Sequence, residues 1–490
     1  MPLIIILLYL GVLTFYNFLQ SRKVQTQDDM MVAGRSLSVT KMVFTLVCTW
    51  IGSGTFIAGA AFAYKAGWSS LWMPAGAWVG IGLIYFLAGK IRTFGQYTIG
   101  DILEVRYGKL ARLIGAITLV IAFTTIVSYQ FRAGGYILNI ITNGAMSVET
   151  GQAVAAGFVI LFTALGGMIA VAHTDLPNGI IIVLACLLAT PFVVAASGGW
   201  GAPAATLPAG HFELFSSDFG HYPALKGFSY FLATMLLLLG VQSMYQKFYS
   251  AKTPADAKKA VIWWIVGTVI VESVVIIIAV YATSVVWGNP AVKPDAIVLY
   301  AARNLTPAPV GLLLLAAAVV VVISTGMNYL LSPSTNVIRD IYQRFINPDA
   351  SAEKMVALQK IFIVVLGFVA FLMIFIPTYF KLEISVLSYA YFAYTIYGVA
   401  ITPSLIAALA WKRATKQGGL ASIFTGVIMV IILDIILPMA APGVMIGEDP
   451  WGIPSIYPAL LASVAALVFV SLATPAPTRE TLVKLFPETK

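Results

Sequence analysis

Thirteen apolar runs divide this chain, and most of them are about 20 residues long. A run of that length crosses the apolar part of a bilayer as one helix. Only 10% of the residues are charged and the mean hydropathy is +0.92, whereas soluble domains usually contain about 25% charged residues. The sequence therefore predicts an all-α, polytopic integral membrane protein with 13 transmembrane helices. The runs cover 2–20, 42–64, 70–90, 111–141, 152–172, 177–199, 225–248, 260–287, 309–336, 357–378, 384–410, 418–438 and 454–474.

Lysine and arginine residues indicate how these helices are oriented. If residues 1–23 form the first helix with the N-terminus outside, 23 of the 29 Lys and Arg residues fall on the inner side and five on the outer side. Cytoplasmic loops are enriched in Lys and Arg, so this topology is favoured and places the C-terminus in the cytoplasm. It also explains the net charge of +9 without a nucleic-acid partner. A signal peptide is the alternative for 2–20, but no positive charge precedes the run and no small-residue cleavage site follows it.

The run 42–64 has a centre that is unusual for a spanning helix. Thr49-Trp50-Ile51-Gly52-Ser53-Gly54-Thr55 places two glycines and three hydroxyl residues there. Glycine favours a break in a helix, and the carbonyls that a break frees need a cavity or a ligand inside the membrane. Small residues for close helix packing are the alternative explanation.

The run 225–248 contains a second candidate interruption, at Gly240-Val241-Gln242-Ser243-Met244-Tyr245-Gln246-Lys247. It lies five spans after the first. Interrupted helices at matching places in two halves of a chain are typical of inverted-repeat transporters, which bind ions and substrate at the breaks.

Ionisable side chains inside apolar runs are functional candidates because they are costly in a membrane. Arg132 lies in the middle of 111–141, and its guanidinium suits a substrate carboxylate; a structural pair with Glu272 or Asp434 is the alternative. Asp175 could hold a cation, or could cap a helix that begins near Leu176. Ser324 and Thr325 could offer two oxygens to a hard cation, although helical hydroxyls usually bond to a carbonyl one turn earlier.

The two cysteines and three histidines add no further site. Cys48 and Cys186 lie in apolar runs and predict no disulfide framework. The histidines lack the spacing of metal ligands.

Six short motifs together resemble the sodium:solute symporter family, over nearly the whole chain. They are Gly34-Arg35, Trp50 to Thr55, Gly166-Gly167-Met168 with Thr174-Asp175, Tyr245-Gln246-Lys247, Ser324-Thr325 with Arg339-Asp340-Ile341-Tyr342, and Trp411-Lys412-Arg413 with Gly418-Gly419 and Gly426. This family includes bacterial proline, sialic acid and pantothenate carriers and animal glucose, monocarboxylate and choline carriers. The chain departs from it at His173, Lys247 and Gly419, where members often have tryptophan, arginine and alanine.

The resemblance implies a core of two inverted five-helix repeats with discontinuous helices. The repeats would be 42–199 and 225–410, followed by two peripheral helices in 411–474 and a short cytoplasmic tail, 475–490. The implied sodium ligands are the carbonyls of Thr49, Gly52 and Val321, the hydroxyls of Ser324 and Thr325, and Asp175. The implied substrate contacts are Trp50, Ser53, Thr55, Gln130, Arg132, Gln242 and Tyr245.

We therefore expect a symporter of the cell membrane, not an enzyme, in which inward sodium movement drives uptake of a small organic solute that carries a carboxylate. A choline-like solute is disfavoured, because Arg132 would repel a quaternary amine and Val241 replaces a tryptophan of the choline cage. Two alternatives stay open. One is a proton-coupled or uncoupled carrier of the same fold, and the other is a non-transporting ligand sensor with a separate output partner.

Overall fold

The computed structural model describes residues 2–22, 24–380, 382 and 385–486. Most of them belong to helices, as predicted. The α-helices are α1 (Pro2–Ser21), α2 (Gln27–Val32), α3 (Val39–Trp50), α4 (Ala60–Ala66), α5 (Trp72–Phe94), α6 (Ile99–Tyr107), α7 (Lys109–Ile141), α8 (Val148–Ala196), α9 (Ala202–Thr206), α10 (Pro223–Gly240), α11 (Gln242–Ser250), α12 (Pro254–Val286), α13 (Ile297–Asn304), α14 (Ala308–Asn336), α15 (Ala352–Tyr379), α16 (Val386–Ala400), α17 (Thr402–Ala410), α18 (Lys416–Ile431), α19 (Leu437–Ala440), α20 (Ile456–Ala473) and α21 (Arg479–Val483).

Shorter elements connect or extend these helices. Wider π-helical turns cover Gly54–Gly59, Val337–Ile346 and Ile432–Ile436. The strands β1 (Met445–Ile446) and β2 (Asp449–Pro450) form a two-residue antiparallel ribbon in the loop before α20. The ribbon and an isolated β-bridge between Leu37 and Ala251 are small departures from the all-α prediction.

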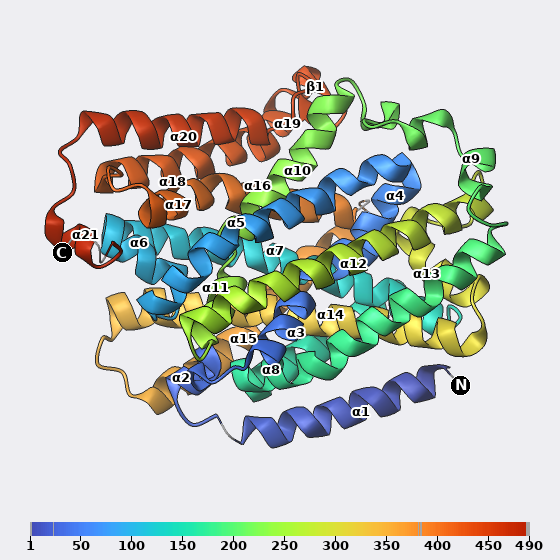
Figure 1. Ribbon diagram of the computed structural model, residues 1–490, viewed down its shortest axis with the longest axis horizontal. Coiled ribbons are helices and arrows are strands. Elements are labelled where there is room, and N and C mark those ends of the chain that lie inside the picture. Colours follow the sequence, from blue (N-terminus) through green and yellow to red (C-terminus); the bar gives the residue numbers. More distant parts are fainter. Residues whose placement is uncertain (1, 23, 381, 383–384, 487–490) are drawn as a thin grey trace.

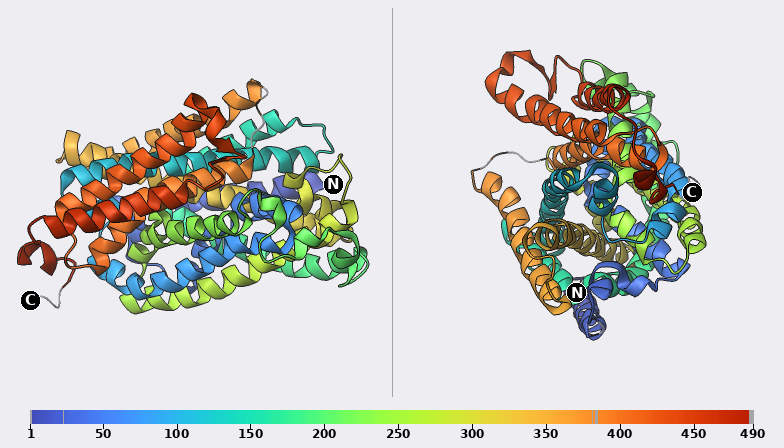
Figure 2. Two further views of the ribbon diagram at one scale, coloured as in Figure 1. Left: turned by 90° about the horizontal axis from the view of Figure 1, so that it is seen from above. Right: turned by 90° about the vertical axis from the view of Figure 1, so that its left-hand side faces the viewer.

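The long helices run side by side along one axis of the molecule (Figure 1). α1 lies along one edge of the bundle and α18 and α20 along the opposite edge, and Figure 2 shows the same arrangement end-on. The two chain ends lie at opposite ends of the long axis. Between the edges, α14 packs against α7 and α8, and α10 packs against α5 and α16.

Ten helices within the described residues are long and apolar enough to cross a membrane. This number differs from the 13 predicted runs for identifiable reasons. The run 42–64 is broken, so that α3 stands alone as a short apolar helix while the segment after the break continues into α5 as Gly54–Phe94. The runs 152–172 and 177–199 both lie in α8 and count as one helix. The run 2–20 corresponds to α1, which is not one of the ten.

Helix α8 is a hairpin rather than one straight rod. Two α8 residues contact neighbouring positions of α14. Val159 contacts Gly326, and Asp175 accepts a hydrogen bond from Ser324, which lies two residues before Gly326. Sixteen residues of straight helix would separate Val159 and Asp175 by about 24 Å, so the chain must reverse between them. It reverses at Gly167, whose φ of 53° and ψ of −158° are outside the helical region. The reversal lies at Gly167 and not, as the predicted runs implied, between 172 and 177.

Candidate functional site

Helix α3 breaks in the middle of the bundle. It ends at Trp50, Ile51 adopts an extended ψ of 92°, and helical turns resume at Gly54. A Cβ atom on Gly52 would lie only 2.7 Å from Cγ2 of Thr325, so this close approach requires glycine. The Thr325 hydroxyl donates to the carbonyls of Cys48 at 2.9 Å and Ile51 at 3.1 Å. The break in α3 and the hydroxyl face of α14 therefore meet.

A buried cluster around Asp175 adjoins this contact. The Asp175 carboxylate is 0% exposed and accepts hydrogen bonds from Thr45 Oγ1 at 2.6 Å, Ser324 Oγ at 2.5 Å and Asn328 Nδ2 at 3.1 Å. Lys247, also fully buried, donates to Asn328 Oδ1, so Asn328 lies between the ammonium and the carboxylate. Asp175 lies eight residues beyond the turn at Gly167, inside an arm of the hairpin. The alternative role of Asp175 as an N-cap of a helix that begins near Leu176 is therefore wrong.

The predicted sodium ligands are partly brought together. Asp175, Ser324 and Thr325 are neighbours, and Val321 lies one turn away in α14. The Gly52 carbonyl accepts the N–H groups of Thr55 and Phe56. The Thr49 hydroxyl bonds back to the carbonyl of Thr45, and the carbonyls that contact Thr325 are those of Cys48 and Ile51.

Sequence reasoning missed five members of this region: Thr45, Cys48, Ile51, Lys247 and Asn328. Two of them carried a periodic signal. Thr45 precedes Thr49 by four residues and Asn328 follows Ser324 by four, so each pair shares one helix face. Hydroxyls, carbonyls, an amide and a carboxylate form an oxygen-rich set, which fits a hard cation such as sodium.

A narrow cavity adjoins the α3 break. It is lined by Trp50, Gly54, Thr55, Gly59, Met73, Pro74, Thr234, Glu272, Ile276 and Tyr394. The rings of Trp50 and Tyr394 lie 6.2 Å apart at a tilt of 32°. The Glu272 carboxylate accepts the indole N–H groups of Trp50 at 2.8 Å and Trp78 at 2.7 Å. The two predicted contacts Trp50 and Thr55 thus line one cavity together with an acid.

Ser53 and Gln130 meet at the same break. The Ser53 backbone N–H donates to Gln130 Oε1 at 3.1 Å. Both side chains are fully buried, and Ser53 Oγ and Gln130 Nε2 have no hydrogen-bond partner among the described residues. Buried donors are nearly always paired, so these two have capacity for a ligand.

Like Ser53 and Gln130, the remaining predicted contacts Arg132, Gln242 and Tyr245 are not part of the cavity lining. Arg132 is half-buried and donates to Thr378 Oγ1 at 3.3 Å and to the Tyr136 hydroxyl at 3.2 Å. Its predicted structural pairing with Glu272 or Asp434 is therefore wrong.

Gln242 and Tyr245 connect the second interruption to its surroundings. The break falls at Val241, between α10 and α11. Gln242 Oε1 accepts the Ile99 N–H at 2.6 Å, and the Tyr245 hydroxyl donates to the Leu239 carbonyl at 2.9 Å. Both side chains are fully buried in these contacts.

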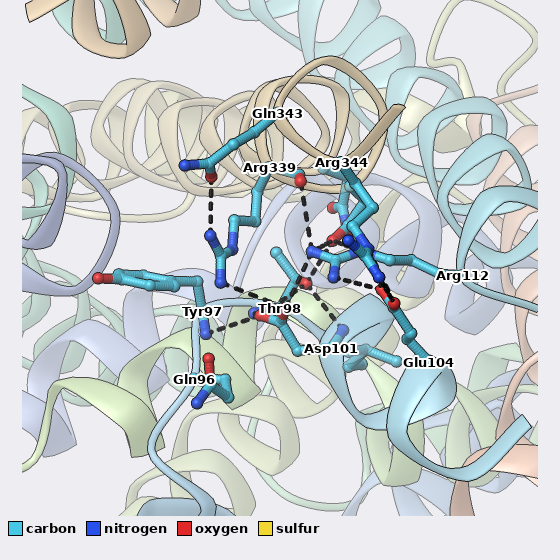
Figure 3. A network of polar contacts seen from close by, with 12 residues as sticks. Gln96, Tyr97, Thr98, Asp101, Glu104, Arg112, Arg339, Gln343 and Arg344 are labelled. Carbon is cyan, nitrogen blue, oxygen red and sulfur yellow. Dashed lines mark hydrogen bonds and ion pairs between the residues drawn. The ribbon is translucent and has the colours of Figure 1, made fainter. Parts of the chain in front are cut away.

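An ion-pair network lies at one end of the bundle, where α6, the start of α7 and the segment Val337–Ile346 meet (Figure 3). Arg112 contacts Asp101 at 2.9 Å, Glu104 at 2.8 Å and Asp340 at 2.6 Å. Arg344 contacts Glu104 at 2.5 Å. Burial alone would raise the pKa of Glu104, but hydrogen bonds from Arg344 and Arg112 outweigh it, and this pKa is lowered.

Comparison with known proteins adds to this geometry. A family model described as the sodium:solute symporter family matches residues 30–426. The high-affinity proline transporter PutP of Bacillus subtilis is 25% identical over 94% of this chain and 95% of its own length. The sodium/pantothenate symporter of Escherichia coli is 24% identical over 83% of this chain and 84% of its own. A solved Na+-coupled sialic acid symporter, in a substrate-bound outward-open state, has the same fold with a TM-score of 0.81, at 17% identity over 97% of this chain and 98% of the other.

Proposed function

Because this chain belongs to the sodium:solute symporter family, we propose that it couples inward sodium movement to the uptake of a small organic solute that carries a carboxylate. It is a multi-pass membrane transporter whose relatives are symporters. We propose that it performs no covalent chemistry and resides in the cell membrane. Binding of both ligands would stabilise an occluded state that opens alternately to the two sides.

The observation that carries this proposal is the contact between the α3 break and α14. Sodium would lie among the hydroxyls of Ser324 and Thr325 and the backbone carbonyls that the break frees. The carboxylate of Asp175, 2.5 Å from the Ser324 hydroxyl, would supply negative charge beside it. A bound cation in this position links two helices that must move relative to each other, so its binding changes the balance between conformations.

We also propose the topology that the charges predict, with 13 crossings, an outer N-terminus and a cytoplasmic C-terminus. Three features support it. The chain termini lie at opposite ends of the long axis (Figure 1), α8 reverses at Gly167, and α3 and α10 are each interrupted. The two interruptions would open the inverted repeats 42–199 and 225–410.

The solute carboxylate would bind at the helix that resumes after the α3 break. Helix N-termini attract anions, and the unpaired donors of Ser53 and Gln130 lie there. Proline, pantothenate and sialic acid, the solutes in the names of the relatives, all carry a carboxylate. Arg132 would attract the solute on its approach. Gln242 and Tyr245 would act by holding the second interruption in place.

The test is the thermal stability of the purified protein in sodium chloride or potassium chloride, with a panel of amino acids, keto acids, monocarboxylates, sugars and sialic acid. A ligand at 100 times its dissociation constant adds about 2.7 kcal/mol of stability. We expect a shift that requires sodium and a carboxylate together, followed by sodium-driven uptake in proteoliposomes. Uptake driven by a pH gradient without sodium would replace the proposal with proton coupling. Binding without flux would replace it with a sensor.

A further inference from the structure

Glu272 is a buried acid that is not part of the proposed sodium site. It lies in α12 with 4% of its surface exposed, and its carboxylate lines the cavity beside the α3 break. It receives the two indole N–H groups of Trp50 and Trp78 and interacts with the side chain of Thr55. All of these partners are neutral.

The Glu272 carboxyl group has no cationic side chain paired with it in the described part of the chain. Every ion pair within the described residues lies elsewhere, and none includes Glu272. By contrast, Asp175 has the Lys247 ammonium on the far side of Asn328. A buried carboxylate without a counter-charge is strongly destabilising inside a membrane protein. The cavity therefore favours a ligand that carries a positive charge.

The rest of the cavity lining also suits a cation. The rings of Trp50 and Tyr394 lie on one side of it, and aromatic faces attract organic ammonium groups. The C-terminal end of α3, at Trp50, carries the negative end of the helix dipole. Three independent features, an acid, two aromatic rings and a helix C-terminus, thus act in the same direction.

We propose that Glu272 binds a protonated amine of the transported solute. A carboxylate has about four acceptor positions, so the indoles leave room for ammonium N–H donors. The proposal rests on the proposed function and deepens it: the solute would be a small zwitterion, with its amine at Glu272 and its carboxylate near Ser53 and Gln130. A quaternary amine has no N–H donor and would not satisfy this carboxylate.

The experiment compares solutes that differ only in the amine. L-proline and tetrahydrofuran-2-carboxylate have the same ring size, as L-alanine and L-lactate have the same chain, but the second member of each pair lacks the cation. Thermal stabilisation by each is titrated in saturating sodium for the wild type and Glu272→Gln. In the wild type we expect an amine-bearing member to bind 10- to 100-fold more tightly than its partner, the range for one charge-assisted hydrogen bond. In Glu272→Gln this preference should fall below about threefold.

A second variant separates recognition from packing. Trp78→Phe removes one indole donor but keeps the acid, so it should retain the preference for the amine.

The proposal is overturned if the wild type binds both members of each pair equally or binds neither pair, or if Glu272→Gln keeps the full preference. Stabilisation of Glu272→Gln by these solutes must still require sodium, because the Asp175 cluster is intact; loss of that requirement would assign Glu272 to ion binding and also overturn the proposal. Amine-selective uptake that ignores sodium would refute the proposed symport while leaving the role of Glu272 intact.

Discussion

The ion-pair network at the end of the bundle and the Asp175 cluster in its middle both bury carboxylates, but they satisfy them differently. In the network, Arg112 directly contacts Asp101, Glu104 and Asp340. In the cluster, Asp175 is surrounded by neutral donors, and Lys247 reaches only Asn328. The network is closed to new ligands because its acids already have cations. The cluster keeps oxygen atoms that an added cation can share.

This difference suggests distinct roles for the two regions. The network joins α6, α7 and the segment after α14 by contacts that depend on the protein alone. It therefore holds that end of the bundle together whether or not a ligand is present. The cluster joins α3, α8 and α14 by contacts that a bound cation would rearrange. Substitutions in the network should affect stability, and substitutions in the cluster should affect the response to sodium.

Arg112→Ala should have the largest effect on stability. It would leave Asp340, which is fully buried, and Asp101 without their closest cation. Breaking a buried ion pair from one side destabilises a protein by about 3–5 kcal/mol. Thermal unfolding in potassium chloride would show it, with Lys109→Ala, an exposed residue of the same helix, as the control. A loss below about 1 kcal/mol would mean that the network does not hold the bundle together.

Asp175→Asn should remove most of the response to sodium while preserving the fold. The amide retains the shape of the side chain but lacks the negative charge beside the proposed ion. We expect the sodium concentration for half-maximal stabilisation to rise by about 100-fold, equivalent to about 2.7 kcal/mol. Asp434→Asn, the same change in a peripheral helix, is the matched control. An unchanged sodium titration in Asp175→Asn would remove this residue from the ion site.

Ser324→Ala combined with Thr325→Ala tests the hydroxyl oxygens without changing the charge. The double variant loses two neutral ligands but retains the carbonyls of the α3 break. We therefore expect a smaller rise, about 10-fold, in the sodium needed for uptake into proteoliposomes. Ser422→Ala, a buried hydroxyl between α18 and α20, provides the control. A double variant with wild-type sodium dependence would reject this position for the ion.

Glu104→Gln should have the smallest effect, and one that depends on pH. The pKa of Glu104 is lowered in the folded protein, so its ionised form stabilises the fold above the pKa of the unfolded chain, about 4.3. At pH 7 the variant should lose up to about 1 kcal/mol, because Arg344 is partly exposed to solvent. The difference from the wild type should vanish as the pH falls through the folded pKa. A difference that stays constant to pH values well below the folded pKa of Glu104 would show that packing, and not ionisation, is responsible.

The sequence predicted the local features of this fold better than the long-range contacts. Gly52 and Gly240 indicated the interruptions, because glycine itself disfavours a continuous helix whatever its neighbours are. The neighbourhood of Asp175 and Ser324 came from the resemblance to a family. No periodic signal could show that Trp50 and Trp78 converge on Glu272, since these residues lie on three separate helices.

Gln242 and Tyr245 were expected to contact the substrate because the family resemblance implied it, and this stays a prediction. In the structure both side chains satisfy backbone groups around the second interruption. The reversal in α8 was misplaced because hydropathy locates a turn by polar residues. Gly167 needs none, as its own conformation reverses the chain.

The reversal at Gly167 also has a consequence for how the protein is made. With no polar loop between them, the two arms of α8 are too closely joined to enter the bilayer one after the other, and we expect them to insert together as a preformed pair. Asp175 would then enter the membrane with the first arm already beside it, which shields its carboxylate from lipid before α14 has been synthesised. A residue with a side chain at Gly167 would meet Met30 at 2.4 Å, so such a change would impair biogenesis before it could affect transport.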